Sequence, residues 1–159
     1  MEHEGFDERD LFRAIAGSGA RALLIGRRAL VALGIPVLTA DYDLWAAADD
    51  ASRLNDALEG LDLFPSCTPE EARGRGRYVL ENDERIDVLI ARSVTTVEGT
   101  RVAFDDVWSR RRELDVGDGV RIAVPSIDDL IATKKFAARA KDLDDIALLE
   151  ALRRERGDA

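Results

Sequence analysis

The sequence predicts an α/β (α+β) domain in which helices pack against the outside of a small mixed β-sheet. Two kinds of segment alternate along the chain. Short apolar runs such as residues 85–91 are typical of strands, whereas Leu54, Leu58 and Leu61 recur at helical spacing. Glycine and proline separate many of these segments, which predicts turns between them. Strands interleaved with helices in this way are expected to form layers around one core.

The chain has 159 residues, which is the length of a single domain. We expect its core at about residues 20–124 and its C-terminal helices at about residues 126–154. The expected strands are residues 21–25, 37–45, 77–81, 85–91 and 120–124, with a further pair within residues 94–104. The expected helices are one capped by Asp7, one at 28–33, one capped by Asp49 or Asp50, a short one at 70–73, one capped by Ser126 and one that begins at Asp142.

Composition excludes several classes of function. Lysine and arginine number 23 against 32 aspartate and glutamate residues, so the formal net charge of −9 disfavours broad electrostatic binding to nucleic acid. The single cysteine cannot form an internal disulfide, and one cysteine with one histidine makes a Cys/His zinc site implausible. With no signal peptide and no apolar run long enough to span a bilayer, we expect a cytoplasmic protein without membrane contact.

The segment Thr39-Ala40-Asp41-Tyr42-Asp43-Leu44-Trp45 suggests a metal site. If it forms a strand, Asp41 and Asp43 point to one face, while Tyr42 and Leu44 point into the core. Two neighbouring carboxylates repel each other unless the face is solvated or a cation lies between them. Their hard oxygen atoms suit Mg²⁺. The alternative is a solvent-facing strand edge, where the two aspartates have no special role.

Two other segments strengthen the metal interpretation. Gly26 ends an apolar run and precedes a helical pattern, and such a strand–turn–helix junction can bind phosphate through backbone N–H groups and the helix dipole. Asp87 lies within another apolar run, where an unpaired carboxylate would be costly. An ordinary turn at Gly26 and a salt bridge from Asp87 to a nearby arginine are the alternatives.

Together the three segments resemble the nucleotidyltransferase superfamily, the fold of DNA polymerase β and of the aminoglycoside nucleotidyltransferases. The family pattern is a Gly-Gly or Gly-Ser turn, then Asp-x-Asp on the next strand, then a third Asp on a later strand. The resemblance looks closest to the minimal bacterial nucleotidyltransferases of toxin–antitoxin and abortive-infection systems, and it covers about residues 20–150. The matching positions are Gly26, Ala29, Leu30, Thr39, Asp41, Asp43 and Asp87, followed by Leu130–Lys134, Arg139, Lys141, Asp142 and Asp145.

The resemblance implies a reaction and its participants. A nucleoside monophosphate would move from a nucleoside triphosphate to a hydroxyl acceptor, with release of pyrophosphate. It implies Mg²⁺, with two ions expected, on Asp41, Asp43 and Asp87. The acceptor stays open between a protein hydroxyl, a transfer-RNA end and a small molecule, and a partner toxin or antitoxin chain is a further expectation. The resemblance also implies nucleotide binding by Gly26, Thr39 and Lys134, and it makes Arg139, Lys141 and Asp142 candidates for substrate contact. Arg27 is a further candidate for nucleotide binding because of its own charge and planar guanidinium.

The sequence departs from the family pattern at two positions. Arg27 occupies the place of the second small residue in the turn, and Val37 stands where this branch often has arginine. Arg27 could clamp a phosphate or fill the space that the triphosphate needs. The alternative function is therefore a catalytically inactive nucleotidyltransferase-like antitoxin or interaction protein.

Charged residues near the C-terminal helices also allow two interpretations. Lys134 shares a helix stripe with apolar residues, so it either extends to solvent or enters the cleft to pair with a triphosphate. Arg139, Lys141, Asp142 and Asp145 either form salt bridges that fix two helices or contact a substrate.

Overall fold

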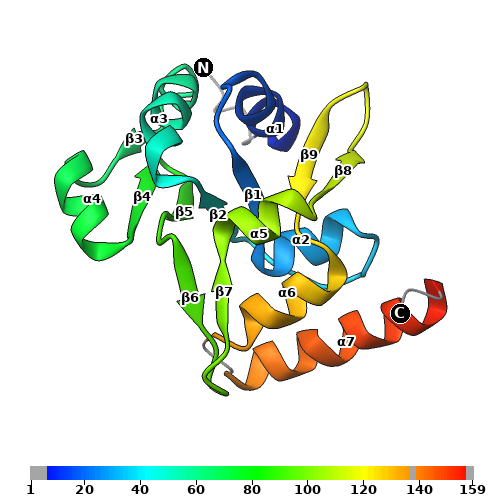
Figure 1. Ribbon diagram of the computed structural model, residues 1–159. Helices are drawn as coiled ribbons and strands as arrows, with labels where there is room; N and C mark the ends of the chain where they lie inside the picture. The colour runs from blue at the N-terminus through cyan, green and yellow to red at the C-terminus, as the bar shows by residue number, and fades with distance from the viewer. Residues whose placement is uncertain (1–6, 137–138, 157–159) are drawn as a thin grey trace.

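A five-stranded mixed sheet lies at the centre of the computed structural model, which describes residues 7–136 and 139–156. The strand order is β1–β2–β5–β4–β3 (Figure 1). The pair β2–β5 is parallel and the other three pairs are antiparallel, so the predicted mixed sheet is confirmed. The strands are β1 (Ala22–Ile25), β2 (Tyr42–Ala46), β3 (Phe64–Pro65), β4 (Arg77–Glu81) and β5 (Arg85–Leu89).

Two smaller antiparallel sheets flank the central one. The first pairs β6 (Ser93–Thr95) with β7 (Arg101–Ala103), which confirms the predicted strand pair in this region. The second pairs β8 (Arg112–Asp115) with β9 (Arg121–Val124). Only β9 is predicted from sequence, because β8 is the sequence Arg-Glu-Leu-Asp and has no apolar run. Its backbone pairing with β9 makes it a strand.

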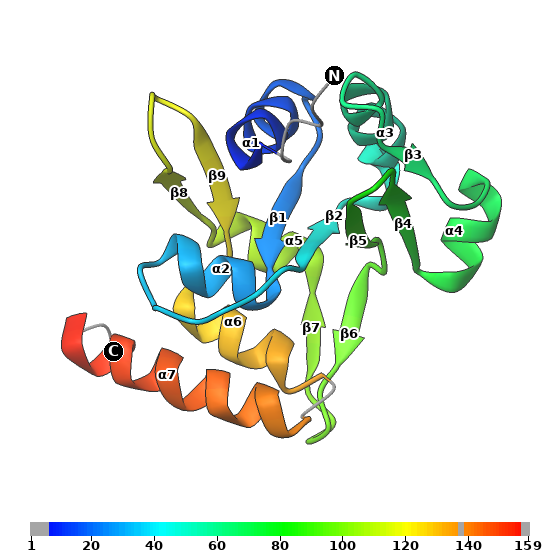
Figure 2. The ribbon, with the colours of Figure 1, turned by 180° about the vertical axis from the view of Figure 1, so that it is seen from behind.

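Helices surround the central sheet (Figures 1 and 2). Asp7 and Ser126 cap helices as predicted, since each side chain accepts a hydrogen bond from a backbone N–H of the first turn. Thr68 and Glu71 form a capping box on the short predicted helix. The helices are α1 (Glu8–Gly17), α2 (Gly26–Ala32), α3 (Ala51–Glu59), α4 (Pro69–Arg75), α5 (Phe104–Ser109), α6 (Ile127–Lys134) and α7 (Ala140–Arg156), with the 3₁₀ helix η1 (Ala48–Asp50) before α3.

Two predicted details are wrong. Neither Asp49 nor Asp50 caps α3 through its side chain. The Asp50 carboxylate instead accepts hydrogen bonds from the backbone N–H and the Nε of Arg21, at 3.0 and 2.9 Å. A charged guanidinium is a stronger partner for a carboxylate than a neutral amide is, so Asp50 ties the start of β1 to η1.

The second strand begins at Tyr42, not at residue 37. Residues before Tyr42 have no neighbour in the sheet, because β1 ends at Ile25, opposite Asp43, and the chain then turns into α2. Asp41 therefore precedes the strand, and strand alternation does not place it on the same face as Asp43.

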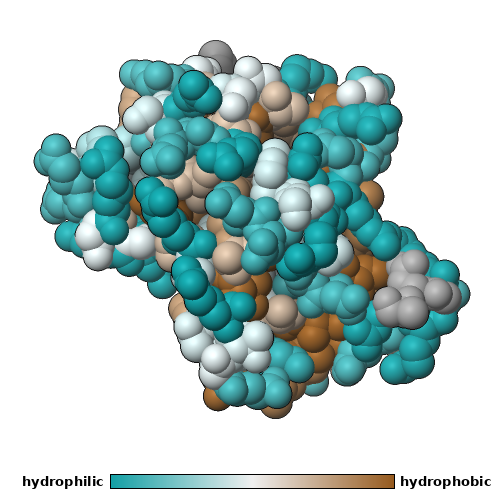
Figure 3. Space-filling view, in the orientation of Figure 1, coloured by the Kyte–Doolittle hydropathy of each residue, from teal (hydrophilic) through white to brown (hydrophobic). Residues whose placement is uncertain are grey.

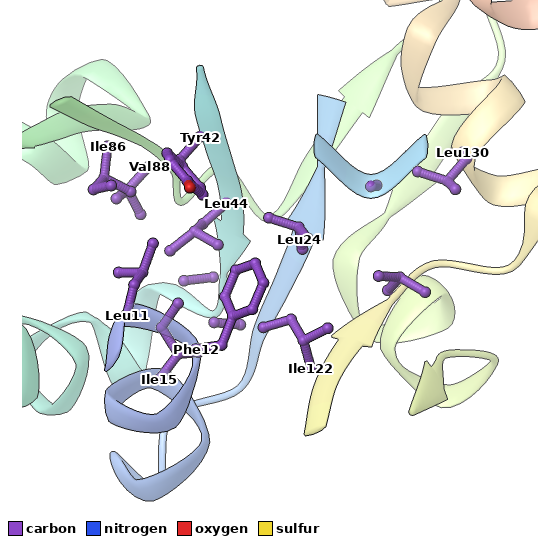
Figure 4. Packing of buried hydrophobic residues seen from close by; sticks show 14 of the residues in the cluster. Leu11, Phe12, Ile15, Leu24, Tyr42, Leu44, Ile86, Val88, Ile122 and Leu130 are labelled. Carbon is purple, nitrogen blue, oxygen red and sulfur yellow. The ribbon is translucent and has the colours of Figure 1, made fainter. Parts of the chain in front are cut away.

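One face of the central sheet forms the main hydrophobic core (Figure 4). Tyr42 and Leu44 point into it, as predicted, and are 6% and 1% exposed. The other residues of this core come mainly from helices, from strands of the central sheet and from β9, among them Leu11, Phe12, Ile15, Leu24, Ile86, Val88, Ile122, Leu130, Ile146 and Leu149. Residues of α1, α2, α3, α4, α6 and α7 all belong to this cluster, so these helices pack around one core.

The other face of the sheet is only partly covered. Trp45 is fully buried there against Phe104 of α5, with ring centres 5.5 Å apart, and its indole Nε1 donates to the carbonyl oxygen of Ala91 at 2.8 Å. This second cluster covers Trp45 and Leu23 but leaves Asp43 and Asp87 partly exposed. The two faces thus separate the main core from the region in which the sequence predicts a site.

Helices α6 and α7 pack side by side at the end of the molecule opposite α1, as both ribbon views show. Most of the surface in Figure 3 is hydrophilic, and hydrophobic residues gather in its lower part, near these two helices. None of the helices in the described ranges has the length and apolar character needed to cross a lipid bilayer.

We predict that Leu24→Ala lowers the free energy of unfolding by about 2–5 kcal/mol, because it leaves a cavity in the centre of the core. Leu24 is fully buried, whereas the control Leu38→Ala removes a leucine that is 90% exposed. Chemical denaturation of both variants measures the difference. Equal losses would contradict the position of Leu24 in the core.

Candidate functional site

Asp43 and Asp87 lie opposite each other on the parallel strands β2 and β5. Neighbouring strands are about 4.8 Å apart, and residues in register point to the same face, so the two carboxylates are adjacent. Both residues are partly exposed, and Asp87 also contacts Arg85 at 3.4 Å. The structure therefore brings together two of the three predicted metal ligands.

Gly26 lies beside this carboxylate pair. Its φ of +68° is one that side chains rarely adopt, and a Cβ added there would lie 2.6 Å from Oδ2 of Asp43. The positive φ favours glycine, and any larger residue would push the Asp43 side chain from its present position. The junction between β1 and α2 is consequently in close contact with the first carboxylate of the pair.

A cavity of about 340 Å³ extends over the carboxylate pair, between the sheet and helices α6 and α7. The sheet side contributes Ile25, Gly26, Asp43, Leu44, Arg77, Asp87, Val88 and Leu89, and the helical side contributes Thr133, Lys134, Phe136, Arg139 and Asp142. We refer to it as the cleft. Its volume is within the range of sites for small ligands.

A smaller cavity of about 50 Å³ lies on the α2 side. It is lined by predicted site residues and by Asp145. The predicted residues are Gly26, Arg27, Thr39, Asp41, Asp43, Lys134, Arg139 and Asp142. Gly26, Asp43, Lys134, Arg139 and Asp142 line both cavities, so the two are neighbouring parts of one region.

Asp41 is separated from Asp87 in this arrangement. Asp41 lines the small cavity and Asp87 lines the cleft, while only Asp43 of the three lines both. Within residues 7–136 and 139–156, no three His, Cys, Asp or Glu side chains come close enough together to hold a metal ion. The position of Asp41 before the strand accounts for its separation from Asp87.

Asp145 of α7 is the centre of a buried ionic cluster. Its side chain is 1% exposed, and one oxygen accepts a hydrogen bond from Nζ of Lys134 at 2.9 Å. Arg27 binds the same carboxylate, with Nε and Nη2 both 3.1 Å from Oδ1. Burial acts to raise the pKa of Asp145, but hydrogen bonds and charge from Lys134 and Arg27 outweigh it and hold the pKa below its ordinary value.

Arg139 and Asp142 form a second pair at the start of α7. The Asp142 carboxylate is buried and accepts from both the backbone N–H and the Nε of Arg139, at 3.0 and 3.1 Å. Lys141 lies in α7, but its side chain lies outside the described part of the structure. Of the two interpretations of this charged segment, the structure shows the salt bridges: Asp142 pairs with Arg139, and Asp145 pairs with Lys134 and Arg27.

Three comparisons with known proteins give the fold a name. No protein-family profile and no curated protein sequence matches the chain. Several solved structures do match its fold, among them the following three. A proposed nucleotidyltransferase from Thermotoga maritima has 16% identity and a TM-score of 0.56, covering 95% of this chain and 91% of that one.

Two further matches are structures of the antibiotic-resistance factor ANT(2″)-Ia. Its solution structure has 15% identity and a TM-score of 0.58, covering 92% of this chain and 89% of that one. Its crystal structure in complex with adenylyl-2″-tobramycin has 16% identity and a TM-score of 0.62, with coverages of 92% and 88%. This chain has the nucleotidyltransferase fold. Identities this low establish the fold alone.

Within the nucleotidyltransferase fold, Arg27 and Arg28 hold the segment that precedes β2. Arg27 Nη1 donates to the carbonyl oxygen of Leu38 at 3.1 Å, and Arg28 Nη2 donates to that of Thr39 at 3.0 Å. The Arg28 guanidinium also lies 4.1 Å from the centre of the Tyr42 ring, and Thr39 Oγ1 accepts from the N–H of Asp41 at 3.1 Å. These contacts replace sheet pairing in the segment.

The role of Arg28 is not apparent from the sequence, because nothing distinguishes it from any other arginine on a helix. Arg27 has a partner that neither predicted role includes, since its guanidinium lies against Asp145 and Leu38. Asp145 is in the predicted charged cluster, but its link to a residue 118 positions away depends on how α2 and α7 pack.

We predict that Gly26→Ala is more destabilising than Gly34→Ala. Both glycines have a positive φ, +68° and +94°, but only at Gly26 would the new Cβ meet Asp43. Gly34→Ala should lower the free energy of unfolding by about 1 kcal/mol, because alanine disfavours the positive φ. Gly26→Ala should lower it by about 2–4 kcal/mol, because the new Cβ also overlaps Asp43. Denaturant unfolding measures both, and equal losses would contradict the close contact.

We also predict that Asp145→Asn lowers the free energy of unfolding at pH 7 by about 3 kcal/mol or more, because it leaves Lys134 buried without its counter-charge. Since the pKa of Asp145 is lowered in the folded state, its stabilisation is fully present above the ordinary value of 3.8 and is lost as the pH falls towards the folded-state pKa. As the pH falls below 3.8, the free energy of unfolding should therefore decrease less in Asp145→Asn than in the wild type.

Denaturation curves at several pH values between 7 and 2.5 test this prediction. Asp128→Asn is the control, because Asp128 pairs with Arg153 at the surface and is 59% exposed. Its loss should be below about 1 kcal/mol. If the two variants lose the same stability at pH 7, the buried cluster does not have the role assigned to it.

Proposed function

We propose that this protein is a metal-dependent nucleotidyltransferase that moves a nucleoside monophosphate from a nucleoside triphosphate to a hydroxyl acceptor and releases pyrophosphate. The observation that carries the proposal is the register of Asp43 with Asp87, beside the glycine junction at Gly26, whose positive φ favours glycine. Two adjacent carboxylates at the floor of a cleft are a suitable arrangement for phosphoryl chemistry. The nucleotidyltransferase fold supports the same assignment.

The carboxylate pair suits a magnesium ion that takes its remaining ligands from substrate and water, since no third acidic side chain joins the pair among the described residues. Asp43 and Asp87 supply the hard oxygen ligands that Mg²⁺ prefers, and water and phosphate oxygens usually complete its coordination. Asp43 and Asp87 would hold the metal, and Asp41 is a third candidate from the neighbouring small cavity. When bound, such an ion neutralises phosphate charge and lowers the pKa of an attacking hydroxyl.

The reaction is an in-line displacement at the α-phosphorus. The acceptor hydroxyl oxygen forms a new P–O bond, the bond between the α-phosphorus and the bridging oxygen breaks, and pyrophosphate leaves with that oxygen. A carboxylate oxygen of Asp87 would take the hydroxyl proton. Gly26 would let the backbone approach the phosphates, since no side chain occupies that space.

The cleft walls would orient the substrates. Lys134 and Arg139 come from the helical side of the cleft and Asp43 and Asp87 from the sheet side, so a bound triphosphate would lie between positive and negative groups. Arg27 and Thr39, in the small cavity, would complete the nucleotide site.

The acceptor is proposed from three classes: a protein hydroxyl, a transfer-RNA end and a small molecule. One solved structure of ANT(2″)-Ia contains adenylyl-2″-tobramycin, which is a property of that protein. The acidic net charge of −9 favours a protein or small molecule over a long nucleic acid. A helical toxin or antitoxin partner belongs to the same proposal.

A second candidate function is a catalytically inactive nucleotidyltransferase-like antitoxin or interaction protein. The observation in its favour is that Asp145 already binds Lys134 and Arg27. These are the two cations that are expected from the sequence to bind phosphates. If they keep these partners when nucleotide is present, the site has less positive charge for a triphosphate.

We predict that Asp43→Asn and Asp87→Asn each lower nucleotidyl transfer by at least about 100-fold, because each removes a metal ligand or the proton acceptor. The measurement is transfer of α-³²P label from each of the four nucleoside triphosphates, with Mg²⁺ or Mn²⁺ and an acceptor of each class. Asp83→Asn is the matched control, since Asp83 is exposed in the turn between β4 and β5.

The melting temperature gives an independent measure of the same site. Nucleotide with Mg²⁺ should raise it through binding to the folded state, and Asp43→Asn should abolish the rise. A full rise in Asp43→Asn would contradict the site. A rise in the wild type without transfer to any acceptor would favour the inactive alternative.

A further inference from the structure

The cleft contains three cations, and two of them already bind carboxylates. Lys134 binds Asp145 and Arg139 binds Asp142. The third, Arg77, is exposed and makes no side-chain hydrogen bond or ion pair with any residue in the described ranges. Among those residues, Arg77 is therefore the cleft cation that remains available for an anion.

The backbone of Arg77 is held firmly in place. Arg77 is the first residue of β4, and its Cα lies opposite that of Leu89 on β5. The carbonyl oxygen of the preceding Gly76 accepts from the N–H groups of Ile90 and Ala91, at 2.8 and 3.1 Å. The guanidinium thus extends from a fixed point on the sheet, which reduces the entropy lost when it binds a ligand.

Arg77 shares a face of the sheet with the carboxylate pair. Along β4, exposed Arg77 and partly exposed Val79 alternate with buried Tyr78 and Leu80. Val79 lies opposite Asp87, so Arg77 is a diagonal neighbour of Asp87, at a Cα separation of about 7–8 Å. A ligand group over Asp87 and Leu89 would be within reach of the long arginine side chain.

The strand order places Arg77 and Gly26 on opposite sides of the carboxylate pair. Gly26 follows β1, Asp43 and Asp87 lie on β2 and β5, and Arg77 lies on β4, which is the next strand in the sheet. Arg77 lines the cleft but not the small cavity around Gly26. If the triphosphate lies at Gly26, an anion at Arg77 belongs to the other substrate.

We propose that Arg77 binds a phosphate group of the acceptor, so that the acceptor is a phosphate-bearing hydroxyl compound and not a polycation. This inference rests on the proposed nucleotidyl transfer. The planar guanidinium matches a phosphate through two parallel hydrogen bonds. Leu89 and the half-exposed Phe136, which also line the cleft, offer apolar surface to the rest of the acceptor. A polycation would place positive charge beside Arg77.

The first test observes Arg77 directly by NMR in the full chain. The Nε–Hε signal of Arg77 is assigned from its loss in Arg77→Lys. The probes are glycerol 3-phosphate, a short oligoribonucleotide with a free 3′-hydroxyl, and tobramycin. We expect saturable shifts of the signal with the two phosphate-bearing probes and none with tobramycin.

Arg77→Ala should weaken binding of the phosphate-bearing probes at least about tenfold, the effect of losing a hydrogen-bonded charge pair. Arg75→Ala is the matched control, because Arg75 is an exposed arginine two residues earlier that does not line the cleft. It should change the dissociation constant less than about twofold. If the wild type binds the oligoribonucleotide more tightly than glycerol 3-phosphate, the acceptor is a nucleic-acid end. If it binds glycerol 3-phosphate more tightly, the acceptor is a small molecule.

The second test separates this inference from the proposed function. In transfer assays, Arg77→Ala should raise KM for the phosphate-bearing acceptor at least about tenfold and leave KM for the nucleoside triphosphate unchanged. An equal rise in both KM values, an unresponsive Arg77 signal or efficient transfer to tobramycin would overturn the inference. Failure of the proposed function appears differently, as absence of transfer to every acceptor and of any nucleotide-dependent melting shift.

Discussion

The ionic cluster at Asp145 determines how the C-terminal helices close the cleft. One carboxylate of α7 binds Lys134 of α6 and Arg27 of α2, and the side chains of Asp145 and Lys134 are 1% and 6% exposed. Separating these charges within a buried environment is costly, whereas keeping all three together satisfies each of them. The cluster therefore fixes one wall of the cleft relative to the sheet that carries Asp43 and Asp87.

This cluster also decides how positive charge is distributed in the cleft. Because Lys134 and Arg27 bind Asp145, and Arg139 binds Asp142, the cations nearest the Gly26 turn are largely neutralised in the absence of ligand. Nucleotide binding would then depend on the metal and on backbone groups, or on release of these cations from their partners. Arg77, the cleft cation on β4, has no carboxylate partner among the described residues. The inference about Arg77 follows from this contrast.

The departure from the family pattern at Arg27 has a structural explanation here. Arg27 and its neighbour Arg28 bind the carbonyl oxygens of Leu38 and Thr39, and so hold a segment that has no strand partner. The same two residues link α2 to α7 and to the Tyr42 ring. Arg27 thus stabilises the folded state through Asp145 and Leu38. Such a structural role is compatible with either an active or an inactive site.

The sequence by itself determined the features that depend on local periodicity and backbone chemistry. Alternating residues defined the hairpin of β4 and β5, the caps at Asp7 and Ser126 defined two helix starts, and Gly26, Asp43 and Asp87 stood out by residue type. Only the tertiary structure decided that Asp41 precedes the strand, that Asp145 binds Arg27 and Lys134, and that Arg77 faces the cleft without a partner among the described residues. The physical reason is that ion pairs and strand ends depend on which segments pack together, and these segments are far apart along the chain.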